Sequence, residues 1–201
     1  MKGIWLQSQN ITKDIDLSSY DIVYLDPKDE KKALWFLDNC NNKVFICINC
    51  FENRDPKKIS SLTEISIEAQ KWCKLSGVDG IILDFIRHTE HSFDFDTINK
   101  TVKHVYDVCR LFKKELKFTV FPFPSCLMFG QNPFHFKKYG TICPMLYGSD
   151  FQVKFNKFVC GKCEPIIRGW DTTIENVQRQ INIVKDNYSI FRYETLRNLY
   201  K

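Results

Sequence analysis

The chain has 201 residues, of which 44% are hydrophobic and 26% are charged, a balance typical of a soluble globular protein of one domain. The formal net charge is +5, but the basic residues are scattered and form isolated pairs such as Lys57-Lys58, so we expect no nucleic-acid interface. No apolar run approaches the roughly 18 residues that a membrane-spanning helix needs, and we expect no membrane contact.

Short apolar runs recur along the whole chain and predict eight strands. Most of these runs are continuous rather than alternating, which is typical of strands buried on both faces of a parallel sheet. In chain order, the predicted strands are Gly3–Gln7, Asp21–Asp26, Lys43–Cys50, Gly80–Ile86, Lys117–Pro122, Thr141–Tyr147, Pro165–Trp170 and Tyr188–Tyr193.

Helical spacing of apolar residues predicts four helices between these strands. They are Lys28–Cys40, Pro56–Leu75, Phe95–Leu116 and Thr172–Lys185. Asp94 or Asp96 is expected to cap the third helix, and Thr172 or Thr173 the fourth. The connections after the first, fifth and sixth strands have weaker patterns, and we expect a single turn or no helix there.

Strands that alternate with helices predict an α/β protein, and eight of them indicate a compact (β/α)8 barrel of the TIM type with several shortened helices. About 200 residues is the lower limit for this fold, and the shortened helices explain how the chain fits. An open doubly wound sheet is the alternative, because it needs no closure. No repeat or linker is visible, so we expect residues 1–201 to form one domain.

A carboxylate near the end of the fourth predicted strand is the first functional candidate. In a (β/α)8 barrel, active sites form at the carboxyl ends of the strands, which is where Asp84 lies. Because side chains alternate along a strand, Asp84 and Ile82 are expected to point into the barrel, and Leu83 and Phe85 toward the helices. A purely structural role for Asp84, in which it pairs with Arg87 or caps a loop, remains open.

The segment Gly77–His88, GVDGIILDFIRH, resembles the fourth-strand motif DGIxLD(Y/F)(I/V)R of glycoside-hydrolase-like barrel families. Cys143–Asp150 resembles their sixth-strand PMxYPS segment, and Pro165–Asp171 their seventh-strand PWLQxF segment. With a plausible eighth strand, the resemblance covers Gly77 to Glu194. It implies a barrel that acts on O-glycosidic bonds of a polysaccharide or glycoconjugate.

The chain departs from these patterns at several positions. The Tyr-Pro that follows the fourth-strand arginine is replaced by His88-Thr89, and the sixth strand has Gly148 where the proline stands. Chitinase-type barrels with a DGxDxDxE motif have a glutamate acid where this chain has Ile86. We therefore do not expect substrate-assisted, chitinase-like chemistry.

Glycosidic cleavage normally needs two carboxyl groups, one as nucleophile or base and the other as acid. The resemblance assigns Asp84 to the first role, and barrel glycosidases of this kind suggest a sixth-strand acid, which is Asp150 here. Asp171 and Glu194, which end the seventh and eighth strands, are the competing acids. Asp26 and Glu52, which end the second and third strands, are expected to bind sugar hydroxyls. The further mouth residues are also expected to bind substrate, the rings of Trp5, Tyr147 and Trp170 by stacking on sugar faces, and Gln7, Arg87, Arg168 and Arg192 by bonding hydroxyls or acidic groups.

Two alternatives to a glycosidase stay open. Trp5 and Trp170 are as well explained as core residues, and the missing tyrosine-proline elements fit a non-catalytic carbohydrate-binding barrel. The same scaffold also supports hydrolysis of an amide or a phosphate ester through a metal or a reactive cysteine. The sequence does not indicate the sugar, the linkage or the oligomeric state.

No cofactor or metal is expected. Cys47-x-x-Cys50 and Cys160-x-x-Cys163 have the spacing of zinc half-sites, but a barrel would place them at opposite ends. The four histidines form no metal motif, and no glycine-rich phosphate loop is present. Nine cysteines without a secretory signal lead us to expect a cytoplasmic protein, and either release by lysis or an intracellular glycan would bring it to its substrate.

Overall fold

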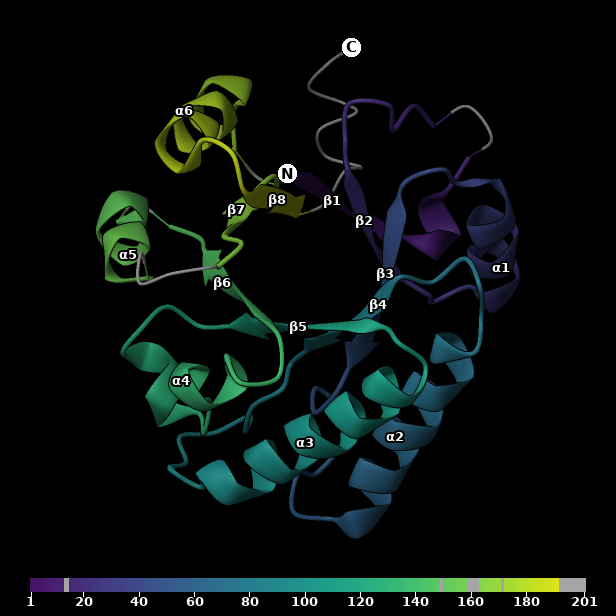
Figure 1. Ribbon diagram of the computed structural model, residues 1–201. Coiled ribbons are helices and arrows are strands. Elements are labelled where there is room, and N and C mark those ends of the chain that lie inside the picture. Colours follow the sequence, from purple (N-terminus) through teal and green to yellow (C-terminus); the bar gives the residue numbers. More distant parts are fainter. Residues whose placement is uncertain (13–14, 149, 159–162, 171, 192–201) are drawn as a thin grey trace.

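A computed structural model describes residues 1–12, 15–148, 150–158, 163–170 and 172–191. Eight parallel strands form a closed barrel in sequence order, with the helices outside it (Figure 1). The strands are β1 Lys2–Gln7, β2 Ile22–Asp26, β3 Lys43–Asn49, β4 Gly80–Asp84, β5 Glu115–Val120, β6 Thr141–Leu146, β7 Ile166–Arg168 and β8 Tyr188–Phe191. The predicted (β/α)8 fold is confirmed.

Closure of the barrel excludes the open doubly wound sheet. β1 pairs in parallel with β8, with Lys2 opposite Tyr188 and Ile4 opposite Ile190. All eight predicted strands are present, and they differ from the prediction by a few residues at their ends. The fourth strand, for example, ends at Asp84 and not at Ile86.

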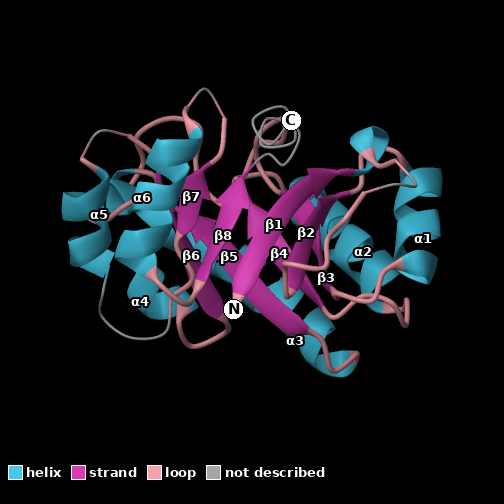
Figure 2. Cartoon of the chain, turned by 90° about the horizontal axis from the view of Figure 1, so that it is seen from above, coloured by secondary structure: helices cyan, strands magenta, loops and turns pink. Residues whose placement is uncertain are grey.

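The helices are α1 Glu30–Asn39, α2 Ile59–Cys73, α3 Phe95–Leu111, α4 Pro133–Phe136, α5 Phe151–Phe158 and α6 Ile174–Val184, with short 3-10 turns η1 Ser8–Asn10 and η2 Ser125–Met128. The helices lie outside the strands, with α4, α5 and α6 on one side and α1 and α2 on the other (Figure 2). Asp94 caps α3 by accepting from the Thr97 N–H, and Thr173 caps α6 in the same way.

Two helix predictions need correction. The third helix ends at Leu111 and not Leu116, because Lys113 has a positive φ of 55° and Glu115 already begins β5. After β6 we expected a turn at most, but α5 has 8 residues.

Alternation along the strands divides the apolar residues into two cores. Leu83 and Ile81 belong to the large core between strands and helices, whereas Ile82 belongs to the smaller core inside the barrel. Inside the barrel, two glycines make room for rings: a Cβ on Gly3 would lie 2.8 Å from the Tyr24 ring, and one on Gly80 would lie 2.4 Å from the Phe45 ring. The rings of Tyr24 and Phe45 therefore fill space in the barrel interior that a side chain at Gly3 or Gly80 would occupy.

A buried polar cluster fills the amino end of the barrel interior. The Lys117 ammonium lies 2.7 Å from Glu164 Oε2 and 2.6 Å from the Tyr24 hydroxyl, and Tyr24 in turn donates to Glu164. Lys117 and Glu164 are 2% and 0% exposed. The barrel is thus closed at this end, and a ligand can enter the interior from the carboxyl ends of the strands.

Candidate functional site

A cavity of about 340 Å³ opens at the carboxyl ends of the strands, and we call it the mouth cavity. Its charged lining comes from the ends of β2 and β4 and from the loops that follow β2, β3 and β4. These charged residues are Asp26, Lys28, Glu52, Asp84 and Arg87. This is the end of a (β/α)8 barrel where active sites form.

Asp84 points into the mouth cavity, as its strand position predicts. Its Oδ1 accepts a hydrogen bond from the Thr119 hydroxyl at 2.6 Å and another from the Phe85 N–H at 2.9 Å. Among the described residues, no donor contacts Oδ2. One carboxylate oxygen is therefore held by two hydrogen bonds, and the other has no hydrogen-bond donor among the described residues.

The residue after Asp84 has an unusual backbone conformation. Phe85 has a φ of 49°, which non-glycine residues seldom adopt and which costs free energy. The turn carries the Phe85 N–H back to Asp84, and it ends the side-chain alternation of β4. The expectation that Phe85 faces the helices is therefore wrong: Phe85 lines the mouth cavity, and Ile86 packs in the helix-side core.

Asp26 and Glu52 share the mouth cavity with Asp84. Asp26 Oδ2 accepts from Gln7 Nε2 at 3.4 Å and lies 3.7 Å from the Lys28 ammonium. Glu52 accepts a hydrogen bond from the Asn49 side chain, and Asn49 stands opposite Asp84 in the sheet. The cavity thus brings together three carboxyl groups from neighbouring positions on the barrel.

Burial raises the pKa of the Asp84 carboxyl, against the lowering effects of the hydrogen bonds from Thr119 and Phe85 and of the Arg87 charge. Burial also raises the pKa of Asp26, and the negative charge of Asp84 adds to the increase while Lys28 opposes it. Burial is the main cause of the raised pKa of the Cys47 thiol, and the negative charges of Asp84 and Asp26 add to it. The Cys47 thiol therefore lies near both carboxylates.

The structural role considered for Asp84 was an ion pair with Arg87, and the structure does not contain this pair. Among the described residues, Asp84 has no salt bridge, and its partners are Thr119 and Phe85. The Arg87 guanidinium lies instead against aromatic rings. Its Cζ is 4.8 Å from the centroid of the Phe85 ring and 4.5 Å from the centroid of the Phe121 ring. The charge of Arg87 still lowers the pKa of Asp84 from a distance.

Aromatic side chains form the rest of the wall. Tyr147 and Trp170 pack edge to face with ring centroids 4.7 Å apart, and Phe191 contacts both. Trp5 is 4% exposed and donates to the Ser189 hydroxyl at 3.1 Å, so it belongs to the floor of the cavity and to the core together. Trp170 is half-buried, and its ring forms part of the cavity wall.

The structure brings most of the candidate residues together. The mouth cavity is lined by Trp5, Gln7, Asp26, Glu52, Asp84, Arg87, Tyr147 and Trp170. Arg168 and Asp150 do not line it: Arg168 Nε donates to the Trp170 carbonyl at 2.9 Å, and the exposed Asp150 pairs with Lys154 at 2.9 Å. Asp171, Arg192 and Glu194 lie outside the described residues.

Several lining residues were not among the candidates. Thr119 and Asn49 are neutral residues within apolar strands, and Phe121 reads as part of a core run. Side-chain alternation along β3 and β5 would have found Asn49 and Thr119. Both side chains point into the barrel, on the two strands that flank Asp84. Lys28 follows a strand end and carried no distinguishing signal.

The described cysteines keep to the arrangement that the topology predicts. Cys47 and Cys50 are buried near the carboxyl end of β3. The backbone of Cys163 instead forms an isolated parallel β-bridge with Ile142, near the start of β6. Cys160 is outside the described residues. Within the described part of the chain, no group of three or more His, Cys, Asp or Glu side chains is arranged to hold a metal ion.

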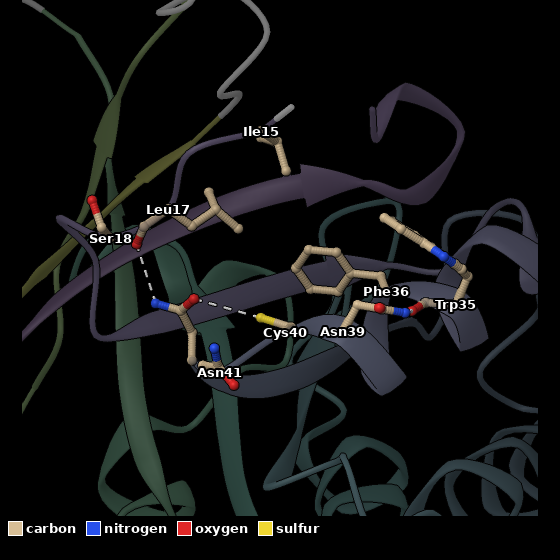
Figure 3. Close-up of a pocket in the computed structure, with 9 residues that line it drawn as sticks. Ile15, Leu17, Ser18, Trp35, Phe36, Asn39, Cys40 and Asn41 are labelled. Carbon is tan, nitrogen blue, oxygen red and sulfur yellow. Dashed lines mark hydrogen bonds between the residues drawn. The ribbon is translucent and has the colours of Figure 1, made fainter. Parts of the chain in front are cut away.

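A larger cavity of about 630 Å³ lies elsewhere, against α1 and the connection that precedes β2. Figure 3 shows Trp35 and Phe36 on one side and Asn41 and Leu17 on the other. The Asn42 side-chain amide donates to the Leu17 carbonyl and accepts from the Cys40 thiol. Among the described residues that line it, none has a carboxyl group, and burial raises the pKa of the Cys40 thiol. The chemistry therefore favours the smaller mouth cavity.

In the described part of the chain, every helix is too short or too polar to cross a lipid bilayer.

Comparisons with protein-family models and with curated proteins find no match to this sequence. Among solved structures, the chain is similar to a chitinase from Chromobacterium violaceum, with a TM-score of 0.60, 11% identity, and coverage of 83% of this chain and 68% of the other. It is also similar to the group IV chitinase of Ostrinia furnacalis in complex with allosamidin, with a TM-score of 0.60, 11% identity and coverage of 82% and 65%.

The E. coli 3-keto-D-glucoside 4-epimerase has a TM-score of 0.58 and 9% identity, and 98% of each chain is covered. The present chain spans about two thirds of the two chitinases but nearly all of the epimerase. At these identities the likeness concerns the fold alone: the chain has the (β/α)8 barrel that these carbohydrate-active proteins share.

Proposed function

We propose that this chain is a glycoside hydrolase-like enzyme that cleaves O-glycosidic bonds of a polysaccharide or glycoconjugate in the mouth cavity. The observation that carries the proposal is the set of carboxyl groups around Asp84, with Asp26 and Glu52 in the same cavity and an aromatic wall opposite. Two carboxyl groups are what glycosidic cleavage requires, and rings are what sugar faces pack against.

In this proposal Asp84 is the base or nucleophile. Its Oδ1 is fixed by Thr119 and Phe85, and its Oδ2 faces the ligand. Asp26 is the acid, because burial, the largest influence on its pKa, favours its protonated form against the opposing effects of the Lys28 charge and the hydrogen bond from Gln7. In an inverting reaction, Asp84 takes a proton from water, the water oxygen bonds the anomeric carbon, and Asp26 protonates the departing oxygen as the glycosidic bond breaks.

The positions of the two carboxyl groups fit this division of roles. Asp26 ends β2 and Asp84 ends β4, so one strand separates them. Neighbouring strands are about 4.8 Å apart, which puts these two backbones roughly 9–10 Å apart, with side chains that converge toward the barrel axis. Carboxyl groups at such positions are compatible with the separation of ~6.5–9.5 Å that inverting glycosidases use.

Substrate-assisted, chitinase-like chemistry is not part of the proposal. The position that corresponds to the chitinase glutamate is Ile86, which is fully buried in the helix-side core. The positive φ of Phe85 turns this position away from the mouth cavity, so a glutamate there would not face a ligand without a change of backbone.

The burial of Ile86 also favours the second candidate function, which is a non-catalytic barrel that binds a carbohydrate. Asp150, the acid that the sixth-strand position suggested, is exposed and does not line the cavity. In a binding protein, Asp84, Asp26 and Glu52 would accept hydrogen bonds from sugar hydroxyls.

Reducing-end release from a panel of cell-wall and storage glycans tests the proposal, with the wild type compared with Asp84→Asn and Asp26→Asn. Each variant is expected to lose about 100- to 10,000-fold in rate, the range that one acid or base contributes. Asp150→Asn is the matched control, because it removes a carboxylate outside the mouth cavity, and its rate should stay near that of the wild type.

If no glycan is cleaved but one still raises the melting temperature, the non-catalytic function is the correct one. Cleavage that survives Asp84→Asn would refute the role of Asp84 directly.

A further inference from the structure

Arg87 occupies an unusual place for a cation on the wall of the mouth cavity. It follows β4 by three residues, and its guanidinium lies among three phenylalanine rings, with centroid distances of 4.8 Å to Phe85, 4.5 Å to Phe121 and 5.8 Å to Phe129. Rings on several sides hold the charged group in one place through cation–π contacts. The guanidinium is therefore oriented before any ligand arrives.

The hydrogen-bonding capacity of this guanidinium is largely unused. Among the described residues, its one acceptor is the His88 carbonyl, 3.3 Å from Nη1. Its Nε is buried and has no partner in the described part of the chain. Buried donors without partners are uncommon and costly, and they call for an explanation.

The carboxylates nearby do not supply the missing acceptors. Asp84 is bonded to Thr119 and Phe85, and Glu52 is bonded to Asn49. Both influence Arg87 only as charges at longer range. Lys28, the other cation of the cavity, lies 3.7 Å from Asp26, whereas no described carboxyl group lies within ion-pair distance of Arg87.

We infer that Arg87 binds an acidic group of the substrate, so that the sugar next to Asp84 carries a carboxylate or a sulfate. A planar guanidinium presents parallel N–H groups that fit two oxygens of an oxyanion, and a fixed orientation makes this fit more selective. The inference rests on the proposed function and narrows it to acidic glycans. Arg87 is then the specificity-determining residue of the site.

Binding of monosaccharides tests this inference without any hydrolysis. D-glucuronate, D-glucose 6-sulfate and D-glucose are titrated calorimetrically into the wild type, Arg87→Met and Arg87→Lys. We expect at least one acidic sugar to bind the wild type about 10- to 100-fold more tightly than glucose, the range that a charged hydrogen bond provides. Arg87→Met should abolish this preference, and Arg87→Lys should keep part of it because the charge remains without the fork.

Two controls exclude simpler explanations. Arg110→Gln removes the same charge from the exposed last turn of α3, and it should leave the preference unchanged. Unfolding of each variant is followed in parallel, and Arg87→Lys serves if Arg87→Met fails to fold. Preference for glucuronate alone identifies a carboxylate, and preference for the sulfated sugar alone identifies a sulfate.

Equal affinity of the wild type for all three sugars overturns the inference. So does an equal loss of affinity for acidic and neutral sugars in Arg87→Met, because Arg87 would then act through Asp84. These outcomes are separable from the proposed function. Cleavage of neutral glycans without a preference for acidic sugars keeps the proposed function and rejects the inference. A preference for acidic sugars without any cleavage keeps the inference and rejects the proposed function.

Discussion

The ion pair that closes the amino end of the barrel allows a quantitative test of the packing. Lys117 and Glu164 are 2.7 Å apart, and their side chains are 2% and 0% exposed. The substitution Glu164→Gln keeps the size of the side chain and an oxygen that can accept from Tyr24. What it removes is the negative charge, which leaves the Lys117 ammonium buried without an anion.

Loss of one partner from a buried pair costs about 3–5 kcal/mol, because the remaining charge keeps its desolvation cost without the attraction that offset it. In a chain of about 200 residues, each kcal/mol lowers the melting temperature by about 2–4 °C. We therefore expect Glu164→Gln to melt roughly 6–20 °C below the wild type. The double variant Lys117→Met with Glu164→Gln should recover most of the loss, since no buried charge remains.

Urea unfolding followed by circular dichroism measures these differences. Glu115→Gln is the matched control, because Glu115 pairs with Lys43 at 3.7 Å with both side chains more than half exposed, and it should cost under about 1 kcal/mol. A cost for Glu164→Gln as small as that of the control would refute the reasoning. So would a double variant that is less stable than the single one.

The carboxyl end of the barrel gives two further predictions. The folded pKa of Asp84 is raised from its ordinary value of 3.8, so the stabilisation from its bound proton is complete below that value and is lost as the pH rises through the folded pKa. In denaturant unfolding at a series of pH values, the wild type should lose stability relative to Asp84→Asn as the pH rises through this window, and a constant difference would contradict the shift. Thr119→Val removes a hydrogen bond that lowers the pKa of Asp84, so the pKa should rise further in an NMR titration of the carboxyl group. Thr101→Val, in helix α3, is the control that should leave it unchanged, and a lower pKa in Thr119→Val would be the contrary result.

Much of the fold was predictable because it depends on local periodicity. Continuous apolar runs located all eight strands, and the alternation within β4 correctly separated the inward Ile82 and Asp84 from the outward Leu83. The prediction failed one residue later. The positive φ of Phe85 interrupts the alternation, and nothing in the apolar pattern signals such a turn in a non-glycine residue.

The candidate site was predictable only in outline. Asp26, Asp84 and Asp150 all follow or end a strand, so the sequence treats them alike. The structure separates them, because Asp26 and Asp84 line the mouth cavity while Asp150 pairs with Lys154 at the surface. Asp84 lies within its strand, whereas Asp150 lies four residues beyond the end of β6, where the direction of a side chain depends on the loop backbone and not on strand alternation.

The sequence by itself determined the order of strands and helices and the inward position of Asp84, since hydrophobic periodicity acts within a few residues. Only the tertiary structure decided which side chains meet. Closure of β8 onto β1 sets the register around the barrel, and this register joins Lys117 to Glu164, 47 residues further along the chain, and places Thr119 against Asp84. Such contacts depend on the geometry of the whole closed barrel, and no local stretch of sequence contains it.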